Sequence, residues 1–259
     1  MRKTKPDKNR LLAALNHQKY DRVPNFEIVI DQRSLSYFLG KKIECSFEQL
    51  DPALKLDFCQ KTGQDAVACN ITPWYGKGFV ECAKDFNKIK FPDQNIWIEK
   101  IKNSEKTLSK ADIGLCLRFG GPLTRTYMAC GPVPIESFMY LLYDDYELVE
   151  KMMKAFTAYT LDTLQAVKKL NFDFFYIGDD LSSSTGPLIS PEHIEKLWAP
   201  CYEQIINSMK SFNKPVICHC CGALQPVLPY FKKWKVNAVH PYSRRPIIFM
   251  KFTENTEKI

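Results

Sequence analysis

Long hydrophobic runs are absent from this sequence. No stretch of the 259 residues approaches the roughly 18 consecutive apolar residues that a membrane-spanning helix requires, so no transmembrane segment is predicted. The apolar residues 11–15, which follow a basic N-terminus, are too few for the hydrophobic region of a signal peptide. We therefore expect a cytoplasmic protein without a membrane partner, in which the ten cysteines are reduced thiols.

Positive charge is not concentrated on a binding face. The formal net charge is +7, but lysine and arginine are scattered along the chain. A single compact basic cluster contains Arg2, Lys3, Lys5, Lys8 and Arg10. No aromatic residues interleave with this cluster, so it offers no stacking surface to bases. We interpret it as a solvated tail and predict no nucleic-acid partner.

Internal repeats and low-complexity linkers are also missing, which favours a single domain over residues 1–259. Strand-like and helix-like segments alternate along that domain, as in a parallel sheet covered by helices. The predicted strands are residues 25–30, 65–71, 115–119, 173–178, 215–220 and 237–240. The predicted helices are residues 10–18 and 50–62, two helices after residue 121 (the second over 144–170), one opening at 190–192, and 223–234.

Residues 73–111 interrupt this rhythm. They hold glycine, proline and short alternating runs, which predict a β-rich excursion after the second strand. A (β/α) barrel of eight strands needs about 250 residues, so the length permits one, yet six strands fall short of eight. The pattern leaves two architectures open: an open, doubly wound sheet, or a barrel without its last two units.

Polar residues follow the predicted strands at their carboxyl ends, where both architectures place a ligand site. In chain order these residues are Glu27, Asp31, Asn70, Arg118, Asp179, Asp180, His219, Cys221 and His240. Successive side chains of a strand point to opposite faces, so one at most of the two adjacent aspartates reaches a pocket. The other is then free to cap the following turn.

Residues 218–222, with the sequence CHCCG, form the most informative motif. Alternation places His219 and Cys221 on one face of a strand, and Cys218 and Cys220 on the other. Imidazole and thiolate are good zinc ligands, but a catalytic zinc normally takes three protein ligands. Further donors in the sequence are Cys69, Cys130 and His240. The competing interpretation is a group of core cysteines beside a hydrogen-bonded histidine.

Several segments together resemble the uroporphyrinogen decarboxylase superfamily, in the same order along the chain. They are RLLAALN (10–16), DRVP (21–24), GPLT (121–124), YDD (143–145), GDD (178–180), GPLISP (186–191), and KPVI (214–217) leading into HCCG (219–222). The likeness extends to about residue 240. It implies a TIM-type (β/α)8 barrel of which about six strands are recognisable, followed by an atypical tail over residues 241–259.

The resemblance implies one of two activities. Decarboxylases of the superfamily act on uroporphyrinogen without a cofactor, whereas its methyltransferases move a methyl group from a corrinoid carried by a partner protein to a thiol. The methyltransferases bind zinc through a His-x-Cys pair, which His219 and Cys221 match, and through a cysteine nearer the C-terminus. The decarboxylases carry an aspartate where this chain has Asn70, and an arginine-rich N-terminal motif that is absent here.

We therefore predict a zinc-dependent, corrinoid-linked methyltransferase. The alternatives are a tetrapyrrole decarboxylase and an inactive barrel fragment that binds a corrinoid or tetrapyrrole partner. Catalysis is assigned to Asp179 and Tyr127. The corresponding tyrosine of the decarboxylases lies one residue later, an offset that rotates a side chain by about 100° on a helix. Substrate binding is assigned to Glu27, Asn70, Arg118, Asp180 and His240. The third zinc ligand is expected beyond Ile259, in a reading frame that has been shortened, and self-association could then cover the open barrel.

Overall fold

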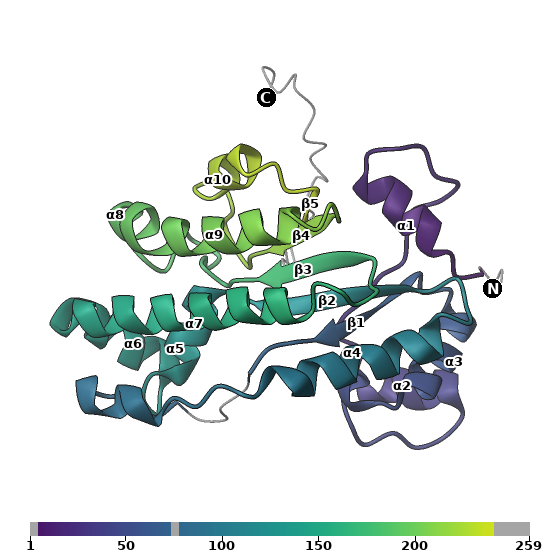
Figure 1. Ribbon diagram of the computed structural model, residues 1–259, viewed down its shortest axis with the longest axis horizontal. Coiled ribbons are helices and arrows are strands. Elements are labelled where there is room, and N and C mark those ends of the chain that lie inside the picture. The colour runs from purple at the N-terminus through teal and green to yellow at the C-terminus, as the bar shows by residue number, and fades with distance from the viewer. Residues whose placement is uncertain (1–4, 74–77, 241–259) are drawn as a thin grey trace.

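One parallel sheet organises the computed structural model, which describes residues 5–73 and 78–240. Its strands are β1 (Ala66–Asn70), β2 (Gly114–Gly120), β3 (Phe174–Gly178), β4 (Val216–His219) and β5 (Ala238–His240). They lie side by side in the order of the sequence, and every neighbouring pair is parallel. Their carboxyl ends therefore meet at one edge of the sheet (Figure 1).

Helices separate the strands. They are α1 (Lys8–Leu15), α2 (Gln32–Leu39), α3 (Pro52–Thr62), α4 (Gln94–Leu108), α5 (Pro122–Ala129), α6 (Pro134–Asp144), α7 (Tyr146–Ala166), α8 (Pro191–His193), α9 (Ala199–Lys210) and α10 (Leu228–Lys233). A π-helical turn, Ile194–Trp198, joins α8 to α9, and 3-10 turns cover Phe47–Gln49 and Ala83–Lys88. The predicted start of α3 is confirmed: the Asp51 side chain accepts from the Ala53 N–H, and Pro52 follows it.

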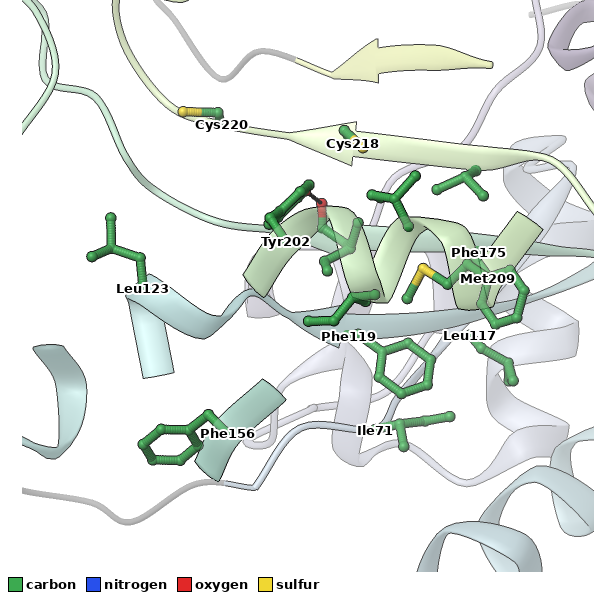
Figure 2. Packing of buried hydrophobic residues seen from close by; sticks show 14 of the residues in the cluster. Ile71, Leu117, Phe119, Leu123, Phe156, Phe175, Tyr202, Met209, Cys218 and Cys220 are labelled. Carbon is green, nitrogen blue, oxygen red and sulfur yellow. Dashed lines mark hydrogen bonds between the residues drawn. The ribbon is translucent and has the colours of Figure 1, made fainter. Parts of the chain in front are cut away.

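The two faces of the sheet have different environments. Side chains on the outer face join a large apolar core beneath helices α4, α7 and α9, part of which is drawn in Figure 2. Cys218 belongs to this core together with Tyr202 and Met209 of α9. The inner face carries a smaller cluster that includes Tyr176 and Ile217 and is closed by α1. This division is what places functional groups on the inner face near the carboxyl ends.

Residues 25–30 do not form the predicted strand. The segment has no regular secondary structure: the Asn25 N–H donates to the Asp65 carboxylate at 2.8 Å, and the Asn25 carbonyl accepts from the Asp65 N–H at 2.7 Å. The Asp65 side chain, directly before β1, thus takes the Asn25 N–H that a neighbouring strand would need for a backbone hydrogen bond. The prediction was wrong because apolar alternation does not show whether a neighbouring strand is within reach.

The β-rich excursion predicted over residues 73–111 is also wrong, because this region contains the fifteen-residue helix α4. Trp97, Ile101 and Leu108 are buried on one face of α4, and the Asp93 side chain caps it. The buried residues Trp97, Ile101 and Leu108 are four and seven residues apart, so the run that resembled strand alternation follows the helical period instead.

Two further helix predictions need correction. Three helices, α5 to α7, follow β2 rather than two, because Pro134 begins α6 only a few residues after α5 ends. The helix predicted over 223–234 is limited to α10. Among the described residues, no helix combines the length and the apolar character needed to cross a membrane.

Candidate metal centre

Three potential metal ligands converge at the carboxyl ends of β3 and β4. The His219 Nε2 atom lies 3.4 Å from the Cys221 Sγ atom and 3.3 Å from the Asp180 Oδ1 atom. The three donor atoms all lie within 4.8 Å of one another, and each residue is half-buried. In the described part of the chain this is the one such group of histidine, cysteine and acidic side chains.

Register and alternation produce this convergence. Gly178 and His219 are paired in the β3–β4 ladder, and the Asp179 N–H continues it by donating to the His219 carbonyl at 2.9 Å. Asp180 and Cys221 each stand two residues beyond that pair, so both point to the inner face with His219. The Cys221 N–H also donates to Asp180 Oδ1 at 3.3 Å, which ties the two strand ends together.

A glycine allows the chain to turn immediately after Cys221. Gly222 has a φ of +80°, and a Cβ atom there would lie 2.1 Å from the Ser183 carbonyl oxygen. That oxygen accepts from the Ala223 N–H at 2.8 Å, so the loop after β3 and the loop after β4 are in direct contact. Only glycine fits both the positive φ and the close approach.

The charges of the site suit a cation. The adjacent His219 side chain lowers the pKa of Asp180, which is therefore a carboxylate at neutral pH. Burial, and then the Asp180 hydrogen bond, raise the pKa of Cys221 to about 12. The free thiol is therefore protonated at neutral pH, and a bound cation is the partner that would favour its thiolate.

The donor set fits zinc in type and in spacing. With zinc bonds of about 2.0 Å to nitrogen, about 2.1 Å to oxygen and about 2.3 Å to sulfur, neighbouring donors in a tetrahedral site lie roughly 3.3–3.6 Å apart. The Nε2–Oδ1 and Nε2–Sγ distances of 3.3 and 3.4 Å are of this size. Three protein ligands would leave the fourth position for a substrate, as in catalytic zinc sites.

Comparison with known proteins identifies the family of this chain. The family model for uroporphyrinogen decarboxylase (URO-D) matches residues 67–251, which is most of the chain. The chain belongs to the uroporphyrinogen decarboxylase family. A methyltransferase from Methanosarcina mazei has a similar structure, with a TM-score of 0.63 and 18% sequence identity over 90% of this chain and 74% of that chain. No curated protein matches the sequence.

Membership of the URO-D family confirms the predicted fold class. The family fold is a TIM-type barrel, and the five parallel strands with helices along their outer face form part of such a barrel. The likeness to the Methanosarcina protein, at this identity, concerns the fold. The candidate metal centre thus lies where barrel enzymes place their active sites, at the carboxyl ends of the strands.

Asp180, the third residue of the candidate metal centre, was expected to bind substrate rather than metal. The other donors suggested by the sequence lie elsewhere: Cys69 and Cys130 are buried in the outer core. His240 is adjacent, with its Nδ1 atom 3.2 Å from the Nδ1 atom of His219, but its side chain is not among the three converging donors. Period-two spacing from Gly178 to Asp180 was the signal available for this assignment.

Asp179 faces away from the site. Its carboxylate is fully buried and accepts from the Thr124 N–H at 2.6 Å, the Leu123 N–H at 3.2 Å and the Trp198 indole at 2.8 Å. It therefore caps the N-terminus of α5 and joins it to β3. Burial raises its pKa to about 6. A Cβ atom on Gly121 would lie 2.2 Å from the Asp179 Cγ atom, so this contact also requires glycine.

Tyr127, Asn70 and Glu27 are not part of the group formed by Asp180, His219 and Cys221. Tyr127 is buried in the outer core, where its ring packs edge-on against Phe138 and burial raises its pKa to about 12. Asn70 Nδ2 donates to both oxygens of Glu48, at 3.0 and 3.1 Å. Glu27 is an exposed residue of segment 25–30, which has no regular secondary structure.

Arg118 lies on the inner face near the trio. Its guanidinium carbon is 5.9 Å from the centre of the Tyr176 ring, and the Tyr176 ring stacks on the His219 imidazole with centroids 5.8 Å apart. Tyr176 was not among the predicted site residues. Its place in an apolar run concealed it, although it shares the face of Gly178 and Asp180 by the same alternation.

Proposed function

We propose that this URO-D family member is a zinc-dependent methyltransferase that moves a methyl group from a methylated corrinoid to a thiol acceptor. The observation that carries this proposal is the convergence of Asp180, His219 and Cys221 with the spacing of a zinc site. The methyltransferase from Methanosarcina mazei has a similar fold, which is compatible with the same activity. The corrinoid would be supplied by a partner protein at the open, carboxyl end of the strands.

When bound, zinc lowers the pKa of a coordinated thiol and so supplies the thiolate, which is the nucleophilic form. The chain contributes the ligands and their charge. One carboxylate, one thiolate and one neutral imidazole together carry two negative charges, which balance those of a divalent zinc ion. An acceptor thiolate at the open position would then retain electron density for attack on a methyl group.

Asn70 argues against decarboxylation as the activity. It has no carboxylate to offer to pyrrole N–H groups, and its amide is already bonded to Glu48. The Lys100 ammonium donates to the Asn70 carbonyl at 2.8 Å, which further fixes this residue. Decarboxylase activity therefore serves as the opposing outcome of the test.

The metal test compares variants of each ligand with a matched cysteine control. We expect the purified wild-type protein to bind one zinc ion, and Asp180→Asn, His219→Ala and Cys221→Ser each to weaken that binding at least tenfold, because three ligands are already the minimum for such a site. Cys82→Ser, which removes an exposed thiol, should bind zinc normally. Isothermal titration and metal analysis make the measurement.

The activity test uses free methylcobalamin as the methyl donor and 2-mercaptoethanol as the acceptor. The wild-type protein should transfer the methyl group, and the three ligand variants should lose this activity in parallel with zinc. Zinc-free wild-type protein that decarboxylates uroporphyrinogen would contradict the proposal.

Arg118 is proposed to bind an acidic group of the acceptor. Within residues 5–73 and 78–240 its guanidinium makes no hydrogen bond or ion pair and lies over the Tyr176 ring. Because the two ring contacts share Tyr176, the guanidinium lies within about 12 Å of the His219 ring, a distance that a short acidic thiol and the arginine side chain together can span.

A pair of acceptors that differ in charge tests this role. Arg118→Gln should raise the KM for 3-mercaptopropionate about tenfold, since a charge-assisted hydrogen bond to a carboxylate is lost. The KM for the neutral 2-mercaptoethanol should not change. Equal effects on both thiols would show that Arg118 does not recognise the acidic group.

A further inference from the structure

The ring nitrogen of His219 that faces away from Asp180 and Cys221 meets the neighbouring strand. His219 and His240 are paired in the β4–β5 ladder. The His219 Nδ1 atom lies 2.5 Å from the His240 carbonyl oxygen and 3.2 Å from the His240 Nδ1 atom. A carbonyl oxygen can only accept a hydrogen bond, so Nδ1 of His219 must carry the proton.

This contact decides which nitrogen of His219 can bind a metal. With the proton held on Nδ1, the lone pair of Nε2 is the available donor, and Nε2 is the atom that faces Asp180 and Cys221. Histidine ligands in proteins commonly donate their second N–H to a carbonyl or carboxylate in this way, which fixes both tautomer and ring orientation.

Tyr176, on β3, contacts the side chain of His240. The Tyr176 hydroxyl lies 3.2 Å from the His240 Nδ1 atom, and a protonated hydroxyl can donate to it. The same tyrosine is 2% exposed, and its ring stacks on His219 with an interplanar angle of 23°. Tyr176 therefore contacts both histidines, His219 through its ring and His240 through its hydroxyl.

We propose that Tyr176 is a positioning residue for the metal centre, acting through His240 to keep His219 in the tautomer that presents Nε2 to Asp180 and Cys221. This inference rests on the proposed zinc site for its purpose, but the tautomer itself does not depend on a bound metal. Tyr176 and His240 would not touch the metal. Their role is to hold the imidazole ring in place before the metal arrives.

The first test reads the tautomer directly in metal-free protein. In a two-dimensional proton–nitrogen spectrum of the histidine rings, we expect a protonated Nδ1 in His219 of the wild-type chain. A His219 ring that carries its proton only on Nε2 would overturn the inference. This result is obtained whether or not the protein binds zinc, so it is separate from the test of the proposed function.

The second test measures zinc affinity in Tyr176→Phe, which keeps the stacked ring and removes only the hydroxyl. We expect the affinity to fall about tenfold, the low end of the loss seen when outer partners of a metal ligand are removed. Tyr159→Phe is the matched control, because it removes another buried tyrosine hydroxyl, one bonded to Trp97 and Pro92 in the helical layer.

A double variant distinguishes positioning from general loss of packing. His240→Phe keeps the backbone carbonyl that accepts from His219 and removes only the ring nitrogen that the Tyr176 hydroxyl contacts. If Tyr176 holds that carbonyl in place through the His240 ring, His240→Phe should weaken zinc binding to a similar degree, and the two changes together should weaken it no more than one alone. Effects that multiply, or a Tyr176→Phe affinity within twofold of the wild type, would overturn the inference. A wild-type chain that binds no zinc but keeps the Nδ1 proton would instead refute the proposed function and leave the tautomer assignment standing.

Discussion

Asp179 and Asp180 are adjacent carboxylates with different surroundings. Asp179 is fully buried between the N-terminus of α5 and Trp198 and has three hydrogen-bond donors, whereas Asp180 lies half-buried beside His219. Alternation along the chain after β3 separates them. The sequence predicted that at most one would reach a pocket, and catalysis was assigned to Asp179. The structure instead places Asp179 on the outer face, where it caps α5.

The buried carboxyl of Asp179 should make stability depend on pH. Burial raises its pKa to about 6, from a usual value of 3.8 that applies to the unfolded chain. The folded state therefore favours the protonated acid, and this stabilisation is complete below about pH 4 and lost as pH rises through about 6. At about 1.4 kcal/mol per pH unit, the loss is on the order of 3 kcal/mol.

Asp179→Asn, which does not titrate, provides the comparison. Between pH 4 and pH 7 the free energy of unfolding of the wild-type chain should fall by about 2–3 kcal/mol relative to that of the variant, because the other titrating groups are common to both. Urea unfolding of metal-free protein at four pH values gives the two curves. Parallel curves would mean that Asp179 has an ordinary pKa in the folded state.

At the scale of elements, the site depends on the contact between two loops. Gly222 lies where the loop after β4 touches the loop after β3; its φ is +80°, and a Cβ atom there would lie 2.1 Å from the Ser183 carbonyl oxygen. Gly222→Ala should destabilise the chain by about 2 kcal/mol or more, since strain and a backbone clash add. It should also weaken zinc binding at least tenfold by displacing Cys221.

Gly40 supplies the control for this glycine. It too has a positive φ, of +69°, but a Cβ atom there meets nothing within 4 Å. Gly40→Ala should therefore cost only about 1 kcal/mol and leave zinc binding unchanged. Equal effects of the two substitutions on zinc affinity, measured by titration, would show that the loop contact does not position Cys221.

Elements differ in how well their sequences predict them. Strands β1 to β5 were each expected, because short apolar runs bounded by turn residues are typical of a parallel sheet. Helix α4 was not, since the three-residue run Ile96 to Ile98 fits strand alternation as well as a helical face. The segment is a helix because it is fifteen residues long, is capped by Asp93, and buries Trp97 and Ile101 on one face. That shared buried face is visible only in the tertiary structure.

At the scale of the whole molecule, the barrel arrangement brings together residues that are distant in sequence. Asp180 and His219 are separated by 39 positions, yet they meet because β3 and β4 are neighbours in parallel register. The same arrangement sets Arg118 and Tyr176 beside each other on β2 and β3. One sheet face thereby carries the proposed ligands, the positioning pair and the proposed acid-binding group.

The sequence by itself determined which side chains of residues 218–221 share a face. Side chains alternate along any strand, so His219 and Cys221 had to be separated from Cys218 and Cys220, and the structure confirms that Cys218 and Cys220 join the outer core. Tertiary structure decided which neighbours meet: that Asp180 faces His219, that Asn70 is bonded to Glu48, and that residues 25–30 remain outside the sheet. Alternation is a local property of the backbone, whereas register between strands depends on contacts across the whole fold.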